Sequence, residues 1–206
     1  MSKKTELIKV FKDYKGKYEI LQVEVQKVNQ NTELTPEGRE NALSRLFEYF
    51  NSIATSHHNK AVELVDKGME TLAEAWKKNS TDKLTDGGYQ AGLSNVIKML
   101  ELGTIQTTED LQNIVDTYKD DFNAVAVIEN ILKTKEITGV VFPVDNREKN
   151  RQLLNQLKGN IDRYINIEKA KRDSSAAFNV TDAAIGMDSM TEFVETRLGD
   201  NLELLN

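Results

Sequence analysis

The sequence predicts an all-α fold: an elongated helical protein with long N-terminal helices, a small central helical cluster, and a C-terminal helix followed by an arm. Three observations support this prediction. The 206 residues include only 2 prolines and 11 glycines, so few positions break a helix. Apolar residues recur every three or four positions along most of the chain, which is the helical period. Charged residues make up 29% of the chain and apolar residues 39%, a balance typical of helices that stay exposed along much of their length.

A first helix with a coiled-coil-like edge is predicted over residues 7–28. The apolar residues of that edge are Leu7, Phe11, Tyr14, Tyr18, Leu21, Val25 and Val28. Within it, LQVEVQ (21–26) alternates apolar and polar residues, which is the period of a strand, so helix and strand both stay open for residues 19–28. The edge is too apolar to leave in water. We therefore hypothesise an interaction surface, covered by a second chain or by the chain's own stripe at residues 43–76.

A second, much longer helix is predicted to start at Pro36, because Thr35 can cap it and proline suits the first helical position. Its apolar stripe keeps to one helical face. If the helix continues to about Lys78, it is roughly 60 Å long at about 1.5 Å per residue. A break at residues 56–59 or at Gly68 would divide it in two, and both alternatives stay open.

Residues 85–135 are predicted to form the compact core, as a cluster of short helices. The polar stretch KKNSTDKLTDGG (77–88) leads into it as a linker or turn. Gly103 is placed to end one helix, and Thr107 or Thr108 to cap the next. A third helix opens at Asp120 or Asp121 and is apolar around most of its circumference, which favours a central position.

The C-terminal third is predicted to begin with the β-like run ITGVVFPVD (137–145), where Pro143 indicates an edge or merely extended segment. A charged helix with a narrow apolar stripe follows, from Asp145 or Asn146 to about Arg172. A short helix around residues 189–198 then lies in an arm whose order depends on a partner. The arm adds these residues to the hypothetical interaction surface: Met190, Phe193, Val194 and Leu198. The expected domains are 1–80, 81–140 and 141–206.

Charge is distributed unevenly along the chain. The net charge of −6 argues against nonspecific nucleic-acid binding, which depends on neutralising phosphates. Residues 1–17 carry six lysines and two acids, whereas residues 174–206 carry six acids and one arginine. These opposite charges could dock one end on the other in the same chain, join neighbouring subunits head to tail, or simply be solvated.

No catalytic, cofactor-binding or metal-ligating residue can be assigned from the sequence. Cysteine is absent, and the adjacent His57 and His58 lack the one-turn spacing of helical zinc ligands. Glycine-rich phosphate-binding motifs and a nucleophile elbow are also absent. The sequence therefore favours a non-enzymatic protein without cofactors. Two alternatives stay open: an enzyme of unrecognised class, and a nucleic-acid-associated protein that uses the basic residues of 3–17 and 147–172.

The chain carries no recognisable secretion signal and no stretch of about 18 apolar residues. We therefore expect a soluble, cytoplasmic protein without membrane contact.

Within residues 87–135, the text GGYQAGLSNVIKMLELGTIQTTEDLQNIVDTYKDDFNAVAVIENIL resembles the small, acidic, cysteine-free helical proteins encoded among the morphogenesis genes of tailed phages of Gram-positive bacteria. The resemblance implies a structural, scaffolding or tail-assembly chaperone role, located in the host cytoplasm or in the virion. It assigns no functional residue. Together with the exposed apolar edges, it predicts a protein that binds other proteins, including phage structural proteins, and forms homo-oligomers.

Overall fold

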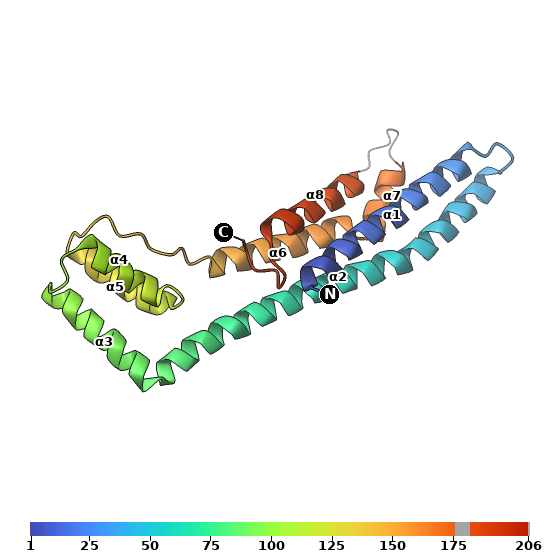
Figure 1. Ribbon diagram of the computed structural model, residues 1–206. Helices are drawn as coiled ribbons and strands as arrows, with labels where there is room; N and C mark the ends of the chain where they lie inside the picture. The colour runs from blue at the N-terminus through green and yellow to red at the C-terminus, as the bar shows by residue number, and fades with distance from the viewer. Residues whose placement is uncertain (176–181, 206) are drawn as a thin grey trace. The chain divides into compact units, whose positions relative to one another are not determined.

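The computed structural model describes residues 1–175 and 182–205, and it confirms the all-α prediction (Figure 1). Within these residues the chain forms eight helices and no strand. The helices are α1 (Lys3–Gln30), α2 (Pro36–Thr85), α3 (Gly87–Leu102), α4 (Thr108–Tyr118), α5 (Phe122–Thr134), α6 (Arg147–Tyr164), α7 (Ile167–Ser175) and α8 (Asp182–Arg197).

The chain divides into two compact units. Unit 1 comprises Met1–Leu72 and Glu148–Asn206, and unit 2 comprises Ala73–Arg147. This division differs from the expected domains 1–80, 81–140 and 141–206, because α1 packs against α8 and so both ends of the chain belong to one unit. Helix α2 contributes residues to both units.

Helix α1 is helical throughout, so the strand alternative for residues 19–28 is wrong. The hydroxyl oxygen of Ser2 caps its start by accepting from the backbone N–H of Thr5 at 3.2 Å. The apparent alternation in LQVEVQ arises because Val23 lies on the water-exposed face, 50% exposed, whereas Leu21 and Val25 are buried. Two buried residues of one helical face, with an exposed valine between them, therefore give the same alternating pattern over six residues as a strand would.

Helix α2 runs unbroken over 50 residues, so the alternative of a break at residues 56–59 or Gly68 is wrong. The backbone N–H of Gly38 donates to the Thr35 hydroxyl at 3.1 Å, which confirms the predicted cap. Gly68 is tolerated because Leu202 packs directly against its backbone, where a Cβ would lie 2.7 Å from the Leu202 Cδ1 atom. The linker or turn expected at 77–88 is shorter than predicted: α2 continues to Thr85, and Asp86 alone separates it from α3.

Unit 1 is built on α1, α2, α6 and α8, which run alongside one another (Figure 1). The Tyr14 ring of α1 packs against the Phe50 ring of α2, with centroids 5.6 Å apart. The C-terminal segment is held by Asn150 of α6, a buried residue whose amide donates to the Leu202 carbonyl at 3.2 Å and accepts from the Leu204 N–H at 3.0 Å. The C-terminal segment is therefore pinned by a buried side-chain amide.

The charged helix expected to run to Arg172 is interrupted, and α7 begins at Ile167. The Asn166 side chain marks the interruption: it donates to the Asp162 carbonyl at 2.7 Å and accepts from the Lys169 N–H at 2.7 Å. The next helix, α8, starts at Asp182, earlier than the expected 189. The part of the expected arm at residues 176–181 lies outside the described residues.

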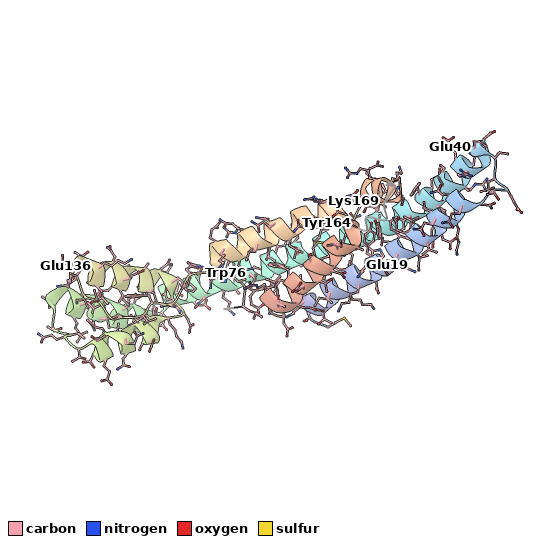
Figure 2. The ribbon with its side chains drawn as sticks, turned by 90° about the horizontal axis from the view of Figure 1, so that it is seen from above. Glu19, Glu40, Trp76, Glu136, Tyr164 and Lys169 are labelled. Atoms are coloured by element: carbon pink, nitrogen blue, oxygen red, sulfur yellow. The ribbon has the colours of Figure 1, made fainter. Side chains whose placement is uncertain are left out.

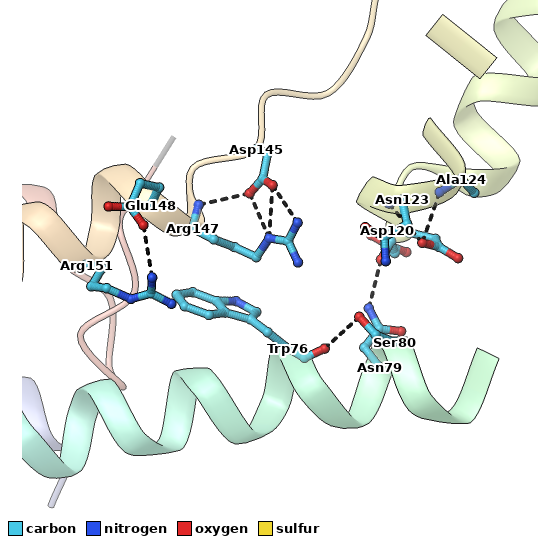
Figure 3. Close-up of polar contacts among 11 residues, drawn as sticks. Trp76, Asn79, Ser80, Asp120, Asn123, Ala124, Asp145, Arg147, Glu148 and Arg151 are labelled. Atoms are coloured by element: carbon cyan, nitrogen blue, oxygen red, sulfur yellow. Dashed lines mark hydrogen bonds and ion pairs between the residues drawn. The ribbon is translucent and has the colours of Figure 1, made fainter. Parts of the chain in front are cut away.

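Unit 2 is a cluster of α3, α4 and α5 with its own core. The predicted caps are confirmed: Gly103 ends α3 with φ 68°, Thr107 caps α4, and Asp121 caps α5. The buried core residues are Leu100, Leu111, Val115, Tyr118, Ala124, Val125, Ile128 and Leu132. Helix α5 contacts both α3 and α4, which agrees with the central position predicted for it. The end of α2 joins this unit, where the Asn79 amide donates to the Asp120 carbonyl at 2.8 Å (Figure 3).

Candidate functional site

The hypothetical interaction edge of α1 lies inside unit 1. Leu7, Phe11, Tyr14 and Tyr18 have no exposed surface, and Leu21 and Val25 are at most 4% exposed. Val28, at the end of the edge, is partly exposed. The interaction-surface hypothesis for this edge is therefore corrected: the chain's own α8 and α2 cover it, and it forms the core of unit 1.

The C-terminal part of the hypothetical surface divides between core and groove. Val194 and Leu198 are fully buried in unit 1, as is nearly all of Met190. Phe193 remains partly exposed, and with Met190 it lines a groove between α6 and α8. Of these four residues, Phe193 is therefore the one that keeps appreciable exposed surface.

The opposite charges at the two ends of the chain meet in unit 1. Lys12 pairs with Glu195 at 2.8 Å, and Lys15 pairs with Asp188 at 2.7 Å. Lys4 donates to the Glu195 carbonyl at 2.8 Å. Of the alternatives predicted from the sequence, docking within one chain is the one the structure shows, because these contacts join α1 to α8. Exposed pairs of this kind contribute little stability individually, but they align the two helices.

A groove with a volume of about 250 Å³ lies between α6 and α8 in unit 1. Its apolar lining consists of Leu153, Leu157, Tyr164, Ile185, Met190 and Phe193, with Gly186 at its floor. Its polar lining consists of Gln156, Asn160, Asp182 and Ser189. The Tyr164 ring lies directly on the backbone of Gly186, where a Cβ would be 2.6 Å from the ring. This glycine therefore permits the close approach of α6 and α8 that closes one end of the groove.

A second hollow, of about 390 Å³, lies between α2 and α7 and is lined mainly by polar side chains. It lacks a continuous apolar wall, so we regard the α6–α8 groove as the better candidate for binding.

A network of charged and phenolic side chains joins α1, α7 and α8. Tyr18 donates to Asp173 at 2.6 Å, and Lys169, labelled in Figure 2, pairs with Asp173 at 2.9 Å and with Asp182 at 2.6 Å. The Asp173 side chain is 7% exposed and that of Lys169 is 13% exposed. Each charge in this interior position is thus balanced by an opposite charge or a hydrogen bond, which is what burial requires.

Burial and hydrogen bonding shift the pKa values of three groups in this network, Tyr18, Lys169 and Asp182. Burial, followed by the hydrogen bond to Asp173, raises the pKa of Tyr18 above its ordinary value. Desolvation acts to lower the pKa of Lys169, but its hydrogen bonds to Asp182 and Asp173 outweigh this effect and raise that pKa. The hydrogen bond from Lys169 lowers the pKa of Asp182. None of these shifts moves a pKa towards neutral pH, as proton transfer in catalysis would require. The network therefore fits a structural role in holding α1, α7 and α8 together.

The two histidines occupy separate positions. The His57 ring is partly buried beside Tyr14, and its Nδ1 atom is 2.8 Å from the Ile53 carbonyl, as a histidine on the apolar stripe requires. His58 contacts Asp162 through Nε2 at 2.7 Å. Among the described residues no group of three or more potential metal ligands comes together.

The basic residues of the nucleic-acid alternative largely face acids. In the 147–172 region, Arg151 pairs with Glu148 at 3.0 Å and Lys158 with Asp66 at 2.7 Å. Arg147 pairs with Asp145 at 2.6 Å (Figure 3). These pairs leave less uncompensated positive charge for phosphates than the sequence suggested.

Unit 2 has several exposed large apolar side chains. Helix α3 is strongly apolar, yet only Leu100 of its residues is buried. The exposed large apolar residues of the unit are Leu84, Met99, Leu102, Val127, Val141 and Val144. Val141 and Val144 belong to the irregular segment that joins α5 to α6, and they are 74% and 73% exposed. The β-like run recognised in the sequence is therefore an irregular segment with an exposed apolar side.

A side-chain amide of α4 fixes that segment in place. The Val141 N–H donates to Gln112 Oε1 at 2.8 Å, and Gln112 Nε2 donates to the Val141 carbonyl at 3.0 Å. The Gln112 amide thus takes the place of a neighbouring strand, which explains why a β-like sequence forms no sheet here. Sequence reasoning recognised the run but could not identify Gln112 as its partner, because the two are far apart in the chain.

None of the described helices is both long enough and apolar enough to cross a membrane. Comparisons of the chain with protein-family models, with curated proteins and with solved structures each gave no match.

Proposed function

We propose that this protein is a non-enzymatic protein-binding protein with a role in assembly, and that the α6–α8 groove receives an amphipathic helix of its partner. The observation that carries the proposal is that apolar side chains line both walls of the groove, Leu153, Leu157 and Tyr164 on α6 and Ile185, Met190 and Phe193 on α8. Grooves of this kind take helices whose apolar residues recur at every turn.

The dimensions of the groove suit a short helix. Its α8 wall extends from Asp182 to Phe193 and its α6 wall from Leu153 to Tyr164. At about 1.5 Å per residue, each wall is roughly 16 Å long, which corresponds to about three helical turns. A partner helix of that length can place an apolar residue opposite each of Leu153, Ile185 and Phe193, three of the lining residues with exposed surface.

Charges beside the groove give the partner helix a preferred orientation. Lys149 and Arg163 are exposed on α6 and share a face with its groove-lining residues, whereas Glu192 is exposed on α8 one turn after Ser189. Within the described residues none of these three makes an ion pair. We therefore assign the partner helix acidic residues on the flank that faces α6 and a basic residue on the flank that faces α8.

The resemblance of residues 87–135 to phage morphogenesis proteins supports the same class of function. On this proposal the partners include structural proteins of a phage, and the protein acts in the host cytoplasm or in the virion. Self-association through the groove is a related form of the proposal, in which the amphipathic helix comes from a second copy.

A display library of amphipathic helices tests the proposal. Its members carry leucine at alternating spacings of three and four residues and differ in the residues that flank this apolar face. With the full chain as bait, we expect enrichment of helices with acidic residues on one flank. The double variant Ile185→Lys and Ser189→Lys changes exposed residues of the groove and should abolish enrichment. Ile20→Lys, at a position of α1 that is 59% exposed, is the matched control and should leave enrichment unchanged.

Two results would contradict this proposal. One is the enrichment of helices that bind the double variant as well as they bind the unmodified chain. The other is the absence of any enriched apolar pattern. Light scattering across protein concentration separates the self-associating form, because an oligomer held by the groove should return to monomer in the double variant but not in Ile20→Lys.

A further inference from the structure

The segment between α5 and α6 forms a second exposed apolar feature, independent of the groove. Val140 and Phe142 point into the core of unit 2, whereas Val141 between them is 74% exposed. Inward and outward side chains therefore alternate over these three residues, as they do in an extended chain. Val144 adds a second outward valine, 73% exposed. We call residues 140–144 the valine strip.

One edge of the valine strip is occupied and the other is available. Gln112 binds both the N–H and the C=O of Val141. In an extended chain the main-chain groups of the neighbouring residues, Val140 and Phe142, point to the opposite edge. Within the part of the chain that the structure describes, no hydrogen bond uses these groups. Main-chain groups without a hydrogen-bond partner are the groups with which an added strand pairs.

The surface beside the valine strip is acidic. Between Thr107 and Asp121, α4 and its two ends carry five acidic residues and one lysine. Glu109 and Asp116 share one face of α4, and Asp120 lies in the turn that follows the helix. Asp116 lies next to the strip because it accepts from the Gln112 amide at 3.0 Å. None of these three carboxylates makes an ion pair among the described residues. An apolar strip beside uncompensated negative charge is complementary to a ligand that is both apolar and basic.

We infer that the valine strip and the acidic face of α4 bind an extended, basic and apolar segment of a partner protein. The apolar side chains of that segment cover Val141 and Val144, its lysine or arginine residues approach Glu109 and Asp120, and its main chain pairs with Val140 and Phe142. This inference does not depend on the α6–α8 groove, since the two surfaces belong to different units and select ligands of different chemistry.

The probe for this inference is a short fluorescent peptide in which lysine and valine alternate, with binding to the full chain followed by anisotropy. We expect binding that weakens as salt is added, and no binding of the peptide in which glutamate replaces lysine. The double variant Val141→Ser and Val144→Ser should weaken binding by about tenfold or more, because it removes the apolar cover. The double variant Glu109→Gln and Asp120→Asn should weaken binding and flatten its salt dependence.

Matched controls keep this test specific. Val127→Ser changes an exposed valine of α5, and Glu101→Gln changes an exposed acid of α3, so both should bind the lysine–valine peptide as the unmodified chain does. Circular dichroism of every variant verifies that the helices are intact. Equal binding by all variants, or no binding of the peptide at low salt, would overturn the inference. So would a concentration-dependent dimer that Val141→Ser abolishes, because a second copy would then occupy the strip.

Discussion

Tyr14 and Tyr18 lie one turn apart on α1 and are both fully buried, yet only the Tyr18 hydroxyl has a hydrogen-bond partner. Tyr18 donates to the Asp173 carboxylate at 2.6 Å. The Tyr14 hydroxyl is buried beside the rings of Phe50 and His57, and no described residue forms a hydrogen bond with it. The same residue type in the same helix therefore has opposite energetic roles, and phenylalanine substitutions separate them.

Tyr18→Phe should destabilise the protein by about 1.5–3 kcal/mol, the usual contribution of a hydrogen bond to a charged group. It leaves one Asp173 oxygen without its phenolic donor in an interior position. Urea unfolding followed by circular dichroism measures the loss. An unchanged free energy of unfolding would show that this bond contributes nothing to stability.

Tyr14→Phe should stabilise the protein by about 1 kcal/mol, because it removes a hydroxyl group that is buried without a partner. The ring contacts with Phe50 and His57 are retained. The same unfolding measurement compares it directly with Tyr18→Phe. A loss of stability similar to that of Tyr18→Phe would contradict the prediction and indicate an additional partner for the Tyr14 hydroxyl.

Stability should fall steeply in alkaline solution. The pKa values of Tyr14, Tyr18 and Lys169 are all raised in the folded chain. A raised pKa contributes stability that is complete below the unfolded value, here 10.0 for tyrosine and 10.5 for lysine, and that is lost as pH rises through the folded value. Unfolding midpoints should therefore drop above about pH 10. The decline should be shallower in Tyr18→Phe, and an unchanged slope would contradict the assignment.

The lowered pKa of Asp182 has the opposite sign. Its contribution is present above the ordinary value of 3.8 and is lost as pH falls through the lowered folded value, so it affects only acid unfolding.

Gly186→Ala should destabilise the protein by about 1–3 kcal/mol, because the new Cβ would overlap the Tyr164 ring. Gly159→Ala in α6 is the matched control. Nothing lies within 4 Å of its added Cβ, so it should stabilise by about 0.5–1 kcal/mol through helix propensity alone. Thermal and urea unfolding of both variants test the pair. Equal changes in the free energy of unfolding for the two variants would show that the contact between Gly186 and the Tyr164 ring does not limit the size of the residue at position 186.

Gln112→Ala should release the valine strip from α4, since it removes both bonds to Val141. We expect faster cleavage by elastase at residues 140–144 with little change in global stability, because opening of this segment is local. Asn113→Ala, at an exposed neighbouring position, is the control and should leave the cleavage rate unchanged. Equal rates in both variants would show that Gln112 does not restrain the segment.

The sequence predicted the helices well where short-range chemistry decides them. Thr35, Gly103, Thr107 and Asp121 all have the capping roles expected of them, because a cap depends only on residues within one turn. The linker or turn predicted at 77–88 is reduced to Asp86, because local hydrogen bonds keep most of this polar stretch helical. Its residues are polar, but hydroxyl side chains such as those of Ser80 and Thr85 bond to carbonyls of their own helix, so polarity did not stop α2.

What covers each apolar face could not be predicted from the sequence. The spacing from Leu7 to Val25 identified a seam but not its cover, because α8 lies at the other end of the chain. The groove and the valine strip depend on similar long-range pairings. Leu153 and Phe193 line opposite walls of the groove, and Gln112 forms hydrogen bonds with Val141 of the valine strip. Short-range periodicity carries no information about such partners.

The pairing of α1 with α8 also has a consequence during synthesis. On the ribosome α1 emerges long before α8, so the aromatic side chains of α1 wait for the intervening helices to be translated before α8 can cover them. Unit 2 lies within one continuous stretch and can fold in the meantime. Truncated chains that lack α8 should therefore bind chaperones or aggregate through α1. Chains that contain α8 cover these aromatic side chains and should do neither.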